Sequence, residues 1–82
     1  MLTTVSVKIS DIYVPSERRK DIDSVKANEF AEQLINGEEL KPIKLRKGKG
    51  RYVLVSGVNR LNAYDAIGES LIEAFIVRAR QF

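Results

Sequence analysis

The chain has 82 residues, of which 44% are apolar, and its 14 lysines and arginines against 11 acidic residues produce a formal net charge of +3. This length allows one domain with a small core over residues 1–82, either as a whole protein or as a fragment of a longer one. Because cysteine and histidine are absent, thiolate nucleophiles, imidazole bases and the common zinc sites are excluded. No secretory signal or apolar run of about 18 residues is visible, so we expect a cytoplasmic location without a membrane partner.

The N-terminal part of the chain alternates between extended and polar segments. Residues 5–9 alternate apolar and polar side chains, which predicts a strand with one buried face. Residues 12–14 are predicted to form a short extended segment ended by Pro15. The polar stretch 16–23 has no apolar periodicity and is predicted to be a loop.

A helix and a hairpin are predicted next. Either Asp23 or Ser24 can cap the helix, apolar residues then recur at spacings of three and four, and Gly37 ends it. Residues 43–46 alternate before a turn over 47–50, which predicts a hairpin with residues 51–55 as its second strand. Since that second strand is apolar on both faces, we expect a central place in the sheet.

The last elements are a second helix and a final strand. The helix is predicted over residues 58–67, ending at Gly68, with Ala63, Tyr64 and Ile67 facing the sheet. A buried strand is predicted over residues 71–77. The order strand, helix, hairpin, helix, strand indicates a compact α+β domain with a small mixed sheet and two main helices.

The turn between the hairpin and the second helix has the pattern of a phosphate-binding loop. An apolar strand runs into Gly57 and then into a helix with Arg60 in its first turn; a helix N-terminus has unpaired N–H groups and a dipole that favours anions. Ser56 can hydrogen-bond a phosphate or cap the helix. The alternative is a plain tight turn, with Arg60 on the surface and paired with an acid such as Asp65.

Basic residues form two clusters. One is Arg18-Arg19-Lys20, and the other has no acid among its members, which are Lys41, Lys44, Arg46, Lys47, Lys49 and Arg51. Such clusters suit polyanions, so DNA is an expected partner of the second one. The alternative is that these cations keep a hairpin tip and an edge strand from aggregating. Few aromatic residues interleave with the charges, which argues against a stacking platform for single strands.

Several motifs occur in a distinctive order and cover nearly the whole chain. They are Pro15-x-x-Arg18-Arg19, Leu40-x-Pro42-Ile43-x-Leu45 and Tyr52-x-Leu54-Val55-x-Gly57-x-x-Arg60, followed by Ala63, Gly68 and an apolar strand. Together they resemble the N-terminal domain of the ParB/sulfiredoxin superfamily, the ParB-like nuclease domain. The resemblance implies that Gly57, Val58, Asn59 and Arg60 form a nucleotide phosphate loop, with Arg18 and Arg19 as upstream contributors. The implied cofactor is a nucleotide, CTP or ATP, with magnesium.

The departures from the family pattern narrow the expected activity. Val58 occupies the position of the catalytic cysteine of sulfiredoxins, so sulfiredoxin chemistry is excluded. Val58 and Asn59 also replace the middle pair of the Gly-Glu-Arg-Arg loop of chromosome-partition ParB proteins, and a second phosphate motif has no room after Phe82. We therefore expect the isolated chain to be weak or inactive as a nuclease or nucleoside triphosphatase.

The function that this pattern favours is a nucleotide- or phosphate-binding module for DNA partition, plasmid or phage maintenance, or regulation. A nuclease or a small-molecule kinase on the same fold is the alternative, with Glu17 or Asp21 as metal ligand or general base. The preferred interpretation of these two residues is a surface acid that balances the arginines. A plain protein-interaction domain is a third reading. The state of association is open, with a homodimer among the possibilities.

Overall fold

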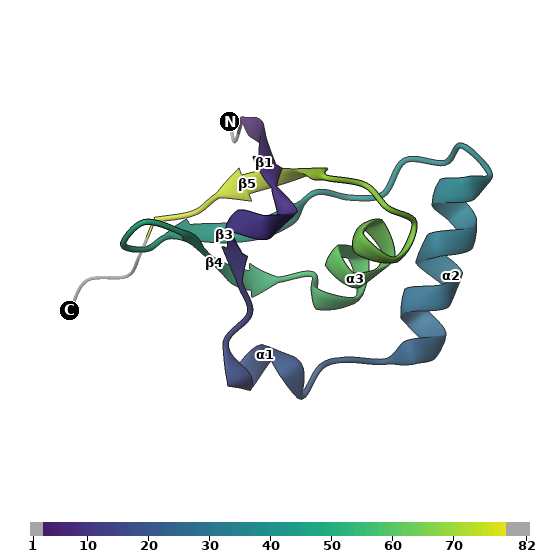
Figure 1. The fold of residues 1–82 in the computed structure, drawn as a ribbon, viewed down its shortest axis with the longest axis horizontal. Coiled ribbons are helices and arrows are strands. Elements are labelled where there is room, and N and C mark those ends of the chain that lie inside the picture. The colour runs from purple at the N-terminus through teal and green to yellow at the C-terminus, as the bar shows by residue number, and fades with distance from the viewer. Residues whose placement is uncertain (1–2, 79–82) are drawn as a thin grey trace.

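The computed structural model describes residues 3–78. Its strands form one five-stranded mixed sheet, and Figure 1 shows α3 and then α2 to one side of this sheet. The sheet order is β1-β5-β3-β4-β2. The strands are β1 (Thr4–Lys8), β2 (Ile12–Tyr13), β3 (Ile43–Lys47), β4 (Tyr52–Ser56) and β5 (Leu71–Ile76). The helices are the 3-10 turn η1 (Ile9–Asp11), α1 (Ser16–Arg19), α2 (Ser24–Ile35) and α3 (Val58–Ala66). The predicted α+β class with a mixed sheet is confirmed.

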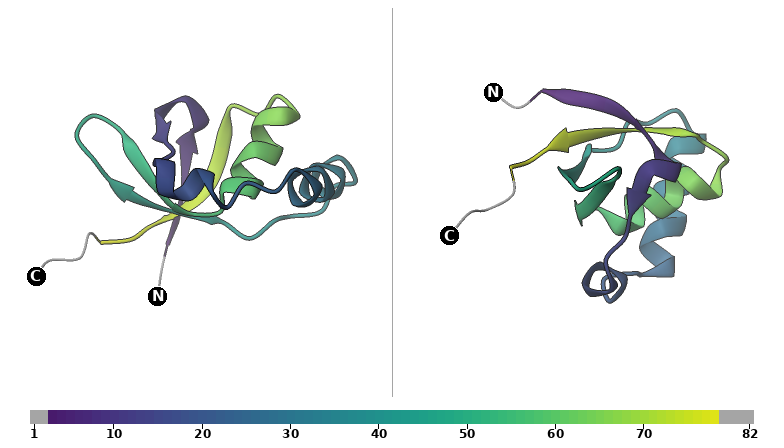
Figure 2. Two further views of the ribbon diagram at one scale, coloured as in Figure 1. Left: turned by 90° about the horizontal axis from the view of Figure 1, so that it is seen from below. Right: turned by 60° about the vertical axis from the view of Figure 1, so that its left-hand side comes forward.

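The sheet curls back on itself because its two edge strands are neighbours in the sequence. β1 pairs antiparallel with β5 at one edge, and β2 pairs parallel with β4 at the other. The three residues of η1 connect these edges, and both views in Figure 2 show the resulting curvature. β3 lies in the middle, parallel to β5 and antiparallel to β4. β4 is interior, as predicted, whereas the edge-strand alternative for the basic hairpin is wrong.

The core lies inside this curl and α3 closes it. Ile43, Leu45 and Leu54 are the largest fully buried side chains, and α3 adds Val58 and Leu61. The predicted apolar face of this helix is therefore incomplete, because its first turn packs directly on the sheet while Tyr64 and Ile67 further along stay half-buried. Burial raises the pKa of the Tyr64 hydroxyl, and the negative charges of Glu39, Glu69 and Glu73 raise it further.

The predicted loop over residues 16–23 is wrong in one part, because Ser16–Arg19 forms a single helical turn. The Pro15 carbonyl accepts hydrogen bonds from the N–H groups of Arg18 at 2.9 Å and of Arg19 at 3.2 Å. No residue of this turn is buried. The turn therefore has no apolar periodicity from which it could be predicted.

The first long helix, α2, begins and ends where the sequence indicates. The Asp23 side chain accepts hydrogen bonds from two N–H groups of its first turn, and Gly37 follows its end with a φ of 84°. No residue of α2 is fully buried. The helix packs beside α3, which lies between α2 and the sheet in Figures 1 and 2.

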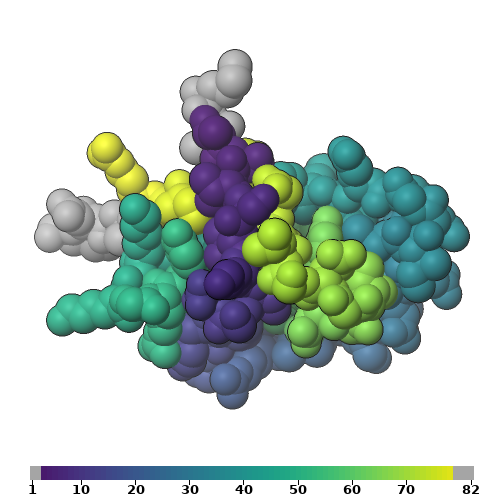
Figure 3. All heavy atoms as spheres, turned by 45° about the horizontal axis from the view of Figure 1, so that its top comes forward, coloured from purple at the N-terminus to yellow at the C-terminus, as the bar shows by residue number. Residues whose placement is uncertain are grey.

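The space-filling view in Figure 3 shows α2 and the tip of the β3–β4 hairpin at opposite ends of the molecule. Within residues 3–78, no helix is long and apolar enough to cross a lipid bilayer.

Candidate functional site

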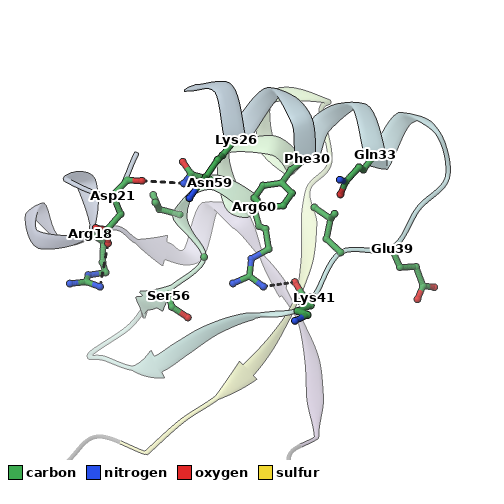
Figure 4. Close-up of a pocket in the computed structure, with 13 residues that line it drawn as sticks. Arg18, Asp21, Lys26, Phe30, Gln33, Glu39, Lys41, Ser56, Asn59 and Arg60 are labelled. Atoms are coloured by element: carbon green, nitrogen blue, oxygen red, sulfur yellow. Dashed lines mark hydrogen bonds and ion pairs between the residues drawn. The ribbon is translucent and has the colours of Figure 1, made fainter. Parts of the chain in front are cut away.

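A cavity of about 610 Å³ lies where the first turn of α3, one face of α2, the segment after α1 and the segment before β3 meet. Figure 4 shows the side chains around it. Its lining consists of Arg18, Asp21, Lys26, Phe30, Gln33, Glu39, Leu40, Lys41, Ser56, Gly57, Val58, Asn59 and Arg60. The cavity therefore gathers most of the predicted loop residues, together with residues of α2 that were not predicted.

Gly57 allows the turn at the base of this cavity. It is the N-cap of α3 with a φ of 104°, a left-handed conformation that residues with a Cβ rarely adopt. A Cβ at this position would lie 2.6 Å from Cγ2 of Ile43, so space also demands glycine. Because glycine has no side chain, no side-chain hydrogen bond caps α3. The first N–H groups of α3 thus form the partial positive charge of a helix N-terminus that borders the cavity.

Arg60 is held beside that turn by the main chain. Its Nη1 donates to the carbonyl oxygens of Lys41 at 3.1 Å and Pro42 at 3.2 Å. A guanidinium has five N–H groups, and within residues 3–78 its Nε and Nη2 have no hydrogen-bond acceptor. In the same described part of the chain Arg60 makes no ion pair with Asp65. Its orientation is therefore set while donors remain for a ligand.

Val58 and Asn59, the two residues between Gly57 and Arg60, have side-chain environments that differ from that of Arg60. The Val58 side chain is buried in the core, so this residue can offer its backbone N–H to the cavity but not its side chain. Asn59 uses its amide for backbone groups of the α1–α2 linker, accepting from the Asp23 N–H at 2.8 Å and donating to the Asp21 carbonyl at 3.1 Å. Neither bond was foreseen from the sequence.

The two upstream arginines, Arg18 and Arg19, lie in different surroundings. Arg18 lines the cavity and pairs with Asp21, with 3.3 Å between Nη1 and Oδ2. Arg19 is exposed and, like Glu17, is not among the lining residues. Ser56 lines the cavity but does not cap α3, because Gly57 takes the N-cap position.

Sequence reasoning missed the α2 wall of the cavity. Lys26, Phe30 and Gln33 line it, and their spacing of four and three residues puts them on one face of the helix. This spacing could have indicated the cavity wall from the sequence, but it coincides in part with the spacing of the apolar face that packs on α3. The lining cations are Arg18, Lys26, Lys41 and Arg60, against the acids Asp21 and Glu39. This excess of positive charge suits an anionic ligand.

Most of the second basic cluster lies away from the cavity. Lys41 lines it, whereas Lys44, Arg46, Lys47 and Lys49 are exposed along β3 and the hairpin turn. The Arg51 guanidinium stacks over the Tyr13 ring, 3.9 Å from its centroid. The sequence cluster is therefore divided between the cavity rim and the hairpin.

Solved structures of similar fold include three functional classes. Sulfiredoxin from Arabidopsis thaliana has a TM-score of 0.80 and 23% identity over 94% of this chain and 86% of its own. The C-terminally truncated ParB from Caulobacter crescentus, complexed with CTP-gamma-S, has a TM-score of 0.81 and 16% identity over 96% of this chain and 46% of its own. A free serine kinase variant complexed with AMP has a TM-score of 0.79 and 18% identity over 93% of this chain and 31% of its own.

These identities show a common fold, and the chain spans less than half of the ParB and kinase chains. No curated protein matches the sequence at a significant level. Residues 2–81, however, match the family described as the ParB N-terminal domain. This match extends over nearly the whole length and includes the motifs around Gly57 and Arg60, and the chain therefore belongs to the ParB N-terminal domain family.

Proposed function

We propose that this domain is a nucleotide-binding module whose cavity holds the phosphates at the N-terminus of α3. The observation that carries the proposal is the uncapped helix start at Gly57 with Arg60 oriented beside it. Backbone N–H groups and a helix dipole bind phosphate without a catalytic side chain. Structures of the same fold in complex with CTP-gamma-S and AMP support the choice of a nucleotide.

The cavity suits a whole nucleotide in size and composition. Its volume of about 610 Å³ falls in the range of roughly 300–1,000 Å³ typical of small-molecule sites. Phe30 offers an apolar surface for a base, and Lys26 and Arg18 add positive charge near the phosphates. CTP and ATP are the candidates that the family suggests.

Magnesium at this site would take most of its ligands from the phosphates of a nucleotide. Within residues 3–78, no three acidic side chains gather as a metal-binding cluster, and the Asp21 carboxylate is paired with Arg18. Mg²⁺ commonly binds through one or two carboxylates plus substrate phosphates. Among the lining carboxylates, Asp21 would have to release Arg18 to serve as such a ligand, and Figure 4 shows Glu39 at the opposite end of the cavity from Asp21.

An amide NMR titration tests the proposal. ATP and CTP, each with magnesium up to millimolar concentration, should shift the amide resonances of residues 57–61 more than those of the hairpin. Adenosine and cytidine are the matched controls, because they lack the phosphates that the helix N-terminus would bind. If neither nucleotide moves these resonances, the phosphate-loop proposal is wrong.

We propose binding rather than catalysis for the isolated domain. Among the described residues, Asp21 is paired with Arg18, and Glu17 lies outside the cavity lining, so neither acid stands free beside the phosphate turn. Turnover of plasmid DNA and of nucleoside triphosphates with magnesium or manganese tests this. Activity that disappears in an Arg60→Ala variant would favour the nuclease or kinase alternative instead.

The wider role that we propose is in DNA partition, plasmid or phage maintenance, or regulation, since these are roles of proteins with ParB-type domains. DNA contact would come from the exposed cations of the hairpin, at the end of the molecule opposite α2. Such contact would be weak, independent of sequence and sensitive to salt, because it would rest on phosphate charges. Tight binding to one duplex sequence at physiological salt would contradict this proposal.

A further inference from the structure

Asn59 connects two parts of the chain that are far apart in sequence. Its Oδ1 accepts a hydrogen bond from the Asp23 N–H, 36 residues earlier, and its Nδ2 donates to the Asp21 carbonyl, 38 residues earlier. Figure 4 shows the side chain directed from the first turn of α3 toward the α1–α2 linker. One amide group thus holds two backbone positions of that linker.

The bond to Asp23 completes the N-terminus of α2 from outside the helix. In a capping box, the side chain at N3 accepts a hydrogen bond from the N–H of the N-cap residue. The N-cap of α2 is Asp23, and its carboxylate already accepts from Val25 and Lys26. The N3 residue is Lys26, which has no acceptor atom. Asn59 supplies the acceptor that Lys26 lacks.

α2 packs against α3 through a face that is only half-buried. No residue of this helix is fully buried, and the half-buried side chains Ala27, Phe30, Ala31 and Leu34 form its inner face. The same helix carries one wall of the cavity, and the linker before it carries Arg18 and Asp21. A small shift of the linker would therefore move several cavity residues together.

From this geometry we propose that Asn59 is a positioning residue, which docks the α1–α2 linker onto α3 and thereby sets the shape of the cavity. The inference rests on the proposed function only for its effect on nucleotide affinity. It also assigns Asn59 a role other than the phosphate contact that the family resemblance implies. Its amide is already engaged by the linker, and the phosphate would meet its backbone N–H instead.

Hydrogen exchange in the protein without ligand is the first test. In an Asn59→Ala variant, exchange of the Asp23 amide should accelerate about 3- to 10-fold, the ratio that corresponds to one hydrogen bond. The amide resonances of Arg18 and Lys26 should shift with it. Asn62→Ala is the matched control, because Asn62 lies one turn further along α3 and outside the cavity lining. Unchanged Asp23 exchange in Asn59→Ala would overturn the proposal, whether or not any nucleotide binds.

Affinity for ATP with magnesium is the second test. Asn59→Ala should weaken binding about 3- to 10-fold while Asn62→Ala leaves it unchanged, because one bond that shapes the site is lost. A loss of affinity without any change in the ligand-free spectrum would make Asn59 a direct ligand contact and overturn the proposal. Failure of the unmodified protein to bind ATP or CTP would instead refute the proposed function, and the exchange test would still decide the role of Asn59.

A Lys26→Gln substitution separates positioning from simple stabilisation of α2. Glutamine at N3 can accept from the Asp23 N–H and so complete a capping box within α2, but it cannot hold the Asp21 carbonyl. In a protein that already carries Lys26→Gln, adding Asn59→Ala should therefore leave hydrogen exchange of the Asp23 amide nearly unchanged. The added substitution should still weaken ATP binding relative to Lys26→Gln alone. If the affinity loss also vanishes in that background, Asn59 merely stabilises the helix and the positioning role is wrong.

Discussion

The two long helices of this domain begin in opposite ways. At the start of α2, the Asp23 carboxylate accepts hydrogen bonds from Val25 at 3.0 Å and Lys26 at 3.3 Å. At the start of α3, Gly57 has no side chain, and no side-chain cap is formed. The acidic cap accepts from two of the first N–H groups of α2 and places a negative charge at the positive end of its dipole. The glycine leaves those of α3 to whatever enters the cavity.

This difference indicates which helix start is structural and which is available for a ligand. An anion at the start of α2 would meet a carboxylate that already occupies the same N–H groups. At the start of α3 it would meet N–H groups that no side chain within residues 3–78 caps. It would also meet Arg60, whose guanidinium is held by the Lys41 and Pro42 carbonyls. Both helices border one cavity, so the capped helix can serve as a wall and the uncapped one as the binding turn.

The largest effect should come from adding a side chain at the uncapped start. Gly57→Ala should destabilise the fold by about 2–5 kcal/mol, since a left-handed residue with a Cβ costs about 1–2 kcal/mol and overpacking adds about 1–3 kcal/mol. The overpacking arises because the Cβ would lie 2.6 Å from Ile43 Cγ2. Urea unfolding measures the loss of stability.

Gly37→Ala is the matched control for that variant. Gly37 also has a positive φ, of 84°, but no atom of the described residues 3–78 lies within 4 Å of its Cβ position. Its cost should stay at about 1–2 kcal/mol. Equal destabilisation at both positions would mean that close packing on Ile43 contributes nothing to the turn.

Removing the charge beside the uncapped start should have the next largest effect. Arg60→Ala should weaken nucleotide binding by about 1.5–3 kcal/mol, roughly 10- to 150-fold, the usual contribution of a hydrogen bond to a charged group. Calorimetric or NMR titration measures this. Arg78→Ala is the control, because Arg78 is exposed and does not line the cavity. A change of only a few tenths of a kcal/mol in the binding free energy of Arg60→Ala would mean that Arg60 is an ordinary surface arginine.

Removing the cap of α2 should act on stability. Asp23→Ala should lower the free energy of unfolding by about 1 kcal/mol, the typical value of an N-cap side chain. Asn28→Ala, at an exposed position within the same helix, should not be destabilising, because alanine has the higher helix propensity. Thermal or urea unfolding compares the two. Equal stability of Asp23→Ala and the unmodified protein would remove the contrast between the helix starts.

The smallest effect is expected far from both helix starts, on the hairpin. Replacing Lys47 and Lys49 by Gln should reduce the slope of log affinity for DNA against log salt by up to about 1.8, since each phosphate contact contributes about 0.9. Fluorescence anisotropy with duplex DNA over a range of salt concentrations measures the slope. Nucleotide binding should be unchanged, because neither lysine lines the cavity. An unchanged slope would exclude both lysines from DNA contact.

Local patterns in the sequence predicted the positions of most elements, but the predicted burial was only partly right, because Val5 in β1 is 39% exposed and Leu71 in β5 is 49% exposed. Alternation predicted the strand over residues 5–9, which the structure has as Thr4–Lys8, and the cap at Asp23 predicted the start of α2. The single turn of α1 was missed, because a turn without a buried residue leaves no apolar pattern. The inner face of α3 was misjudged for a related reason. Periodicity gives the angular spacing of side chains but not which part of a helix meets the sheet.

The residues of the candidate site also include some that the sequence could identify and others that it could not. Gly57 and Arg60 could be identified from adjacent residues, because a strand, a glycine and a helix start lie in one short segment. Their proposed binding role stays a prediction. The α2 wall and the bonds from Asn59 to residues 21 and 23 could not be identified, since they join segments more than 30 residues apart. The sequence by itself determined the tight turn at Gly57 with Arg60 beside it, because its geometry is local. Only the tertiary structure decided which side chains surround that turn, because packing of α2 against α3 brings them there.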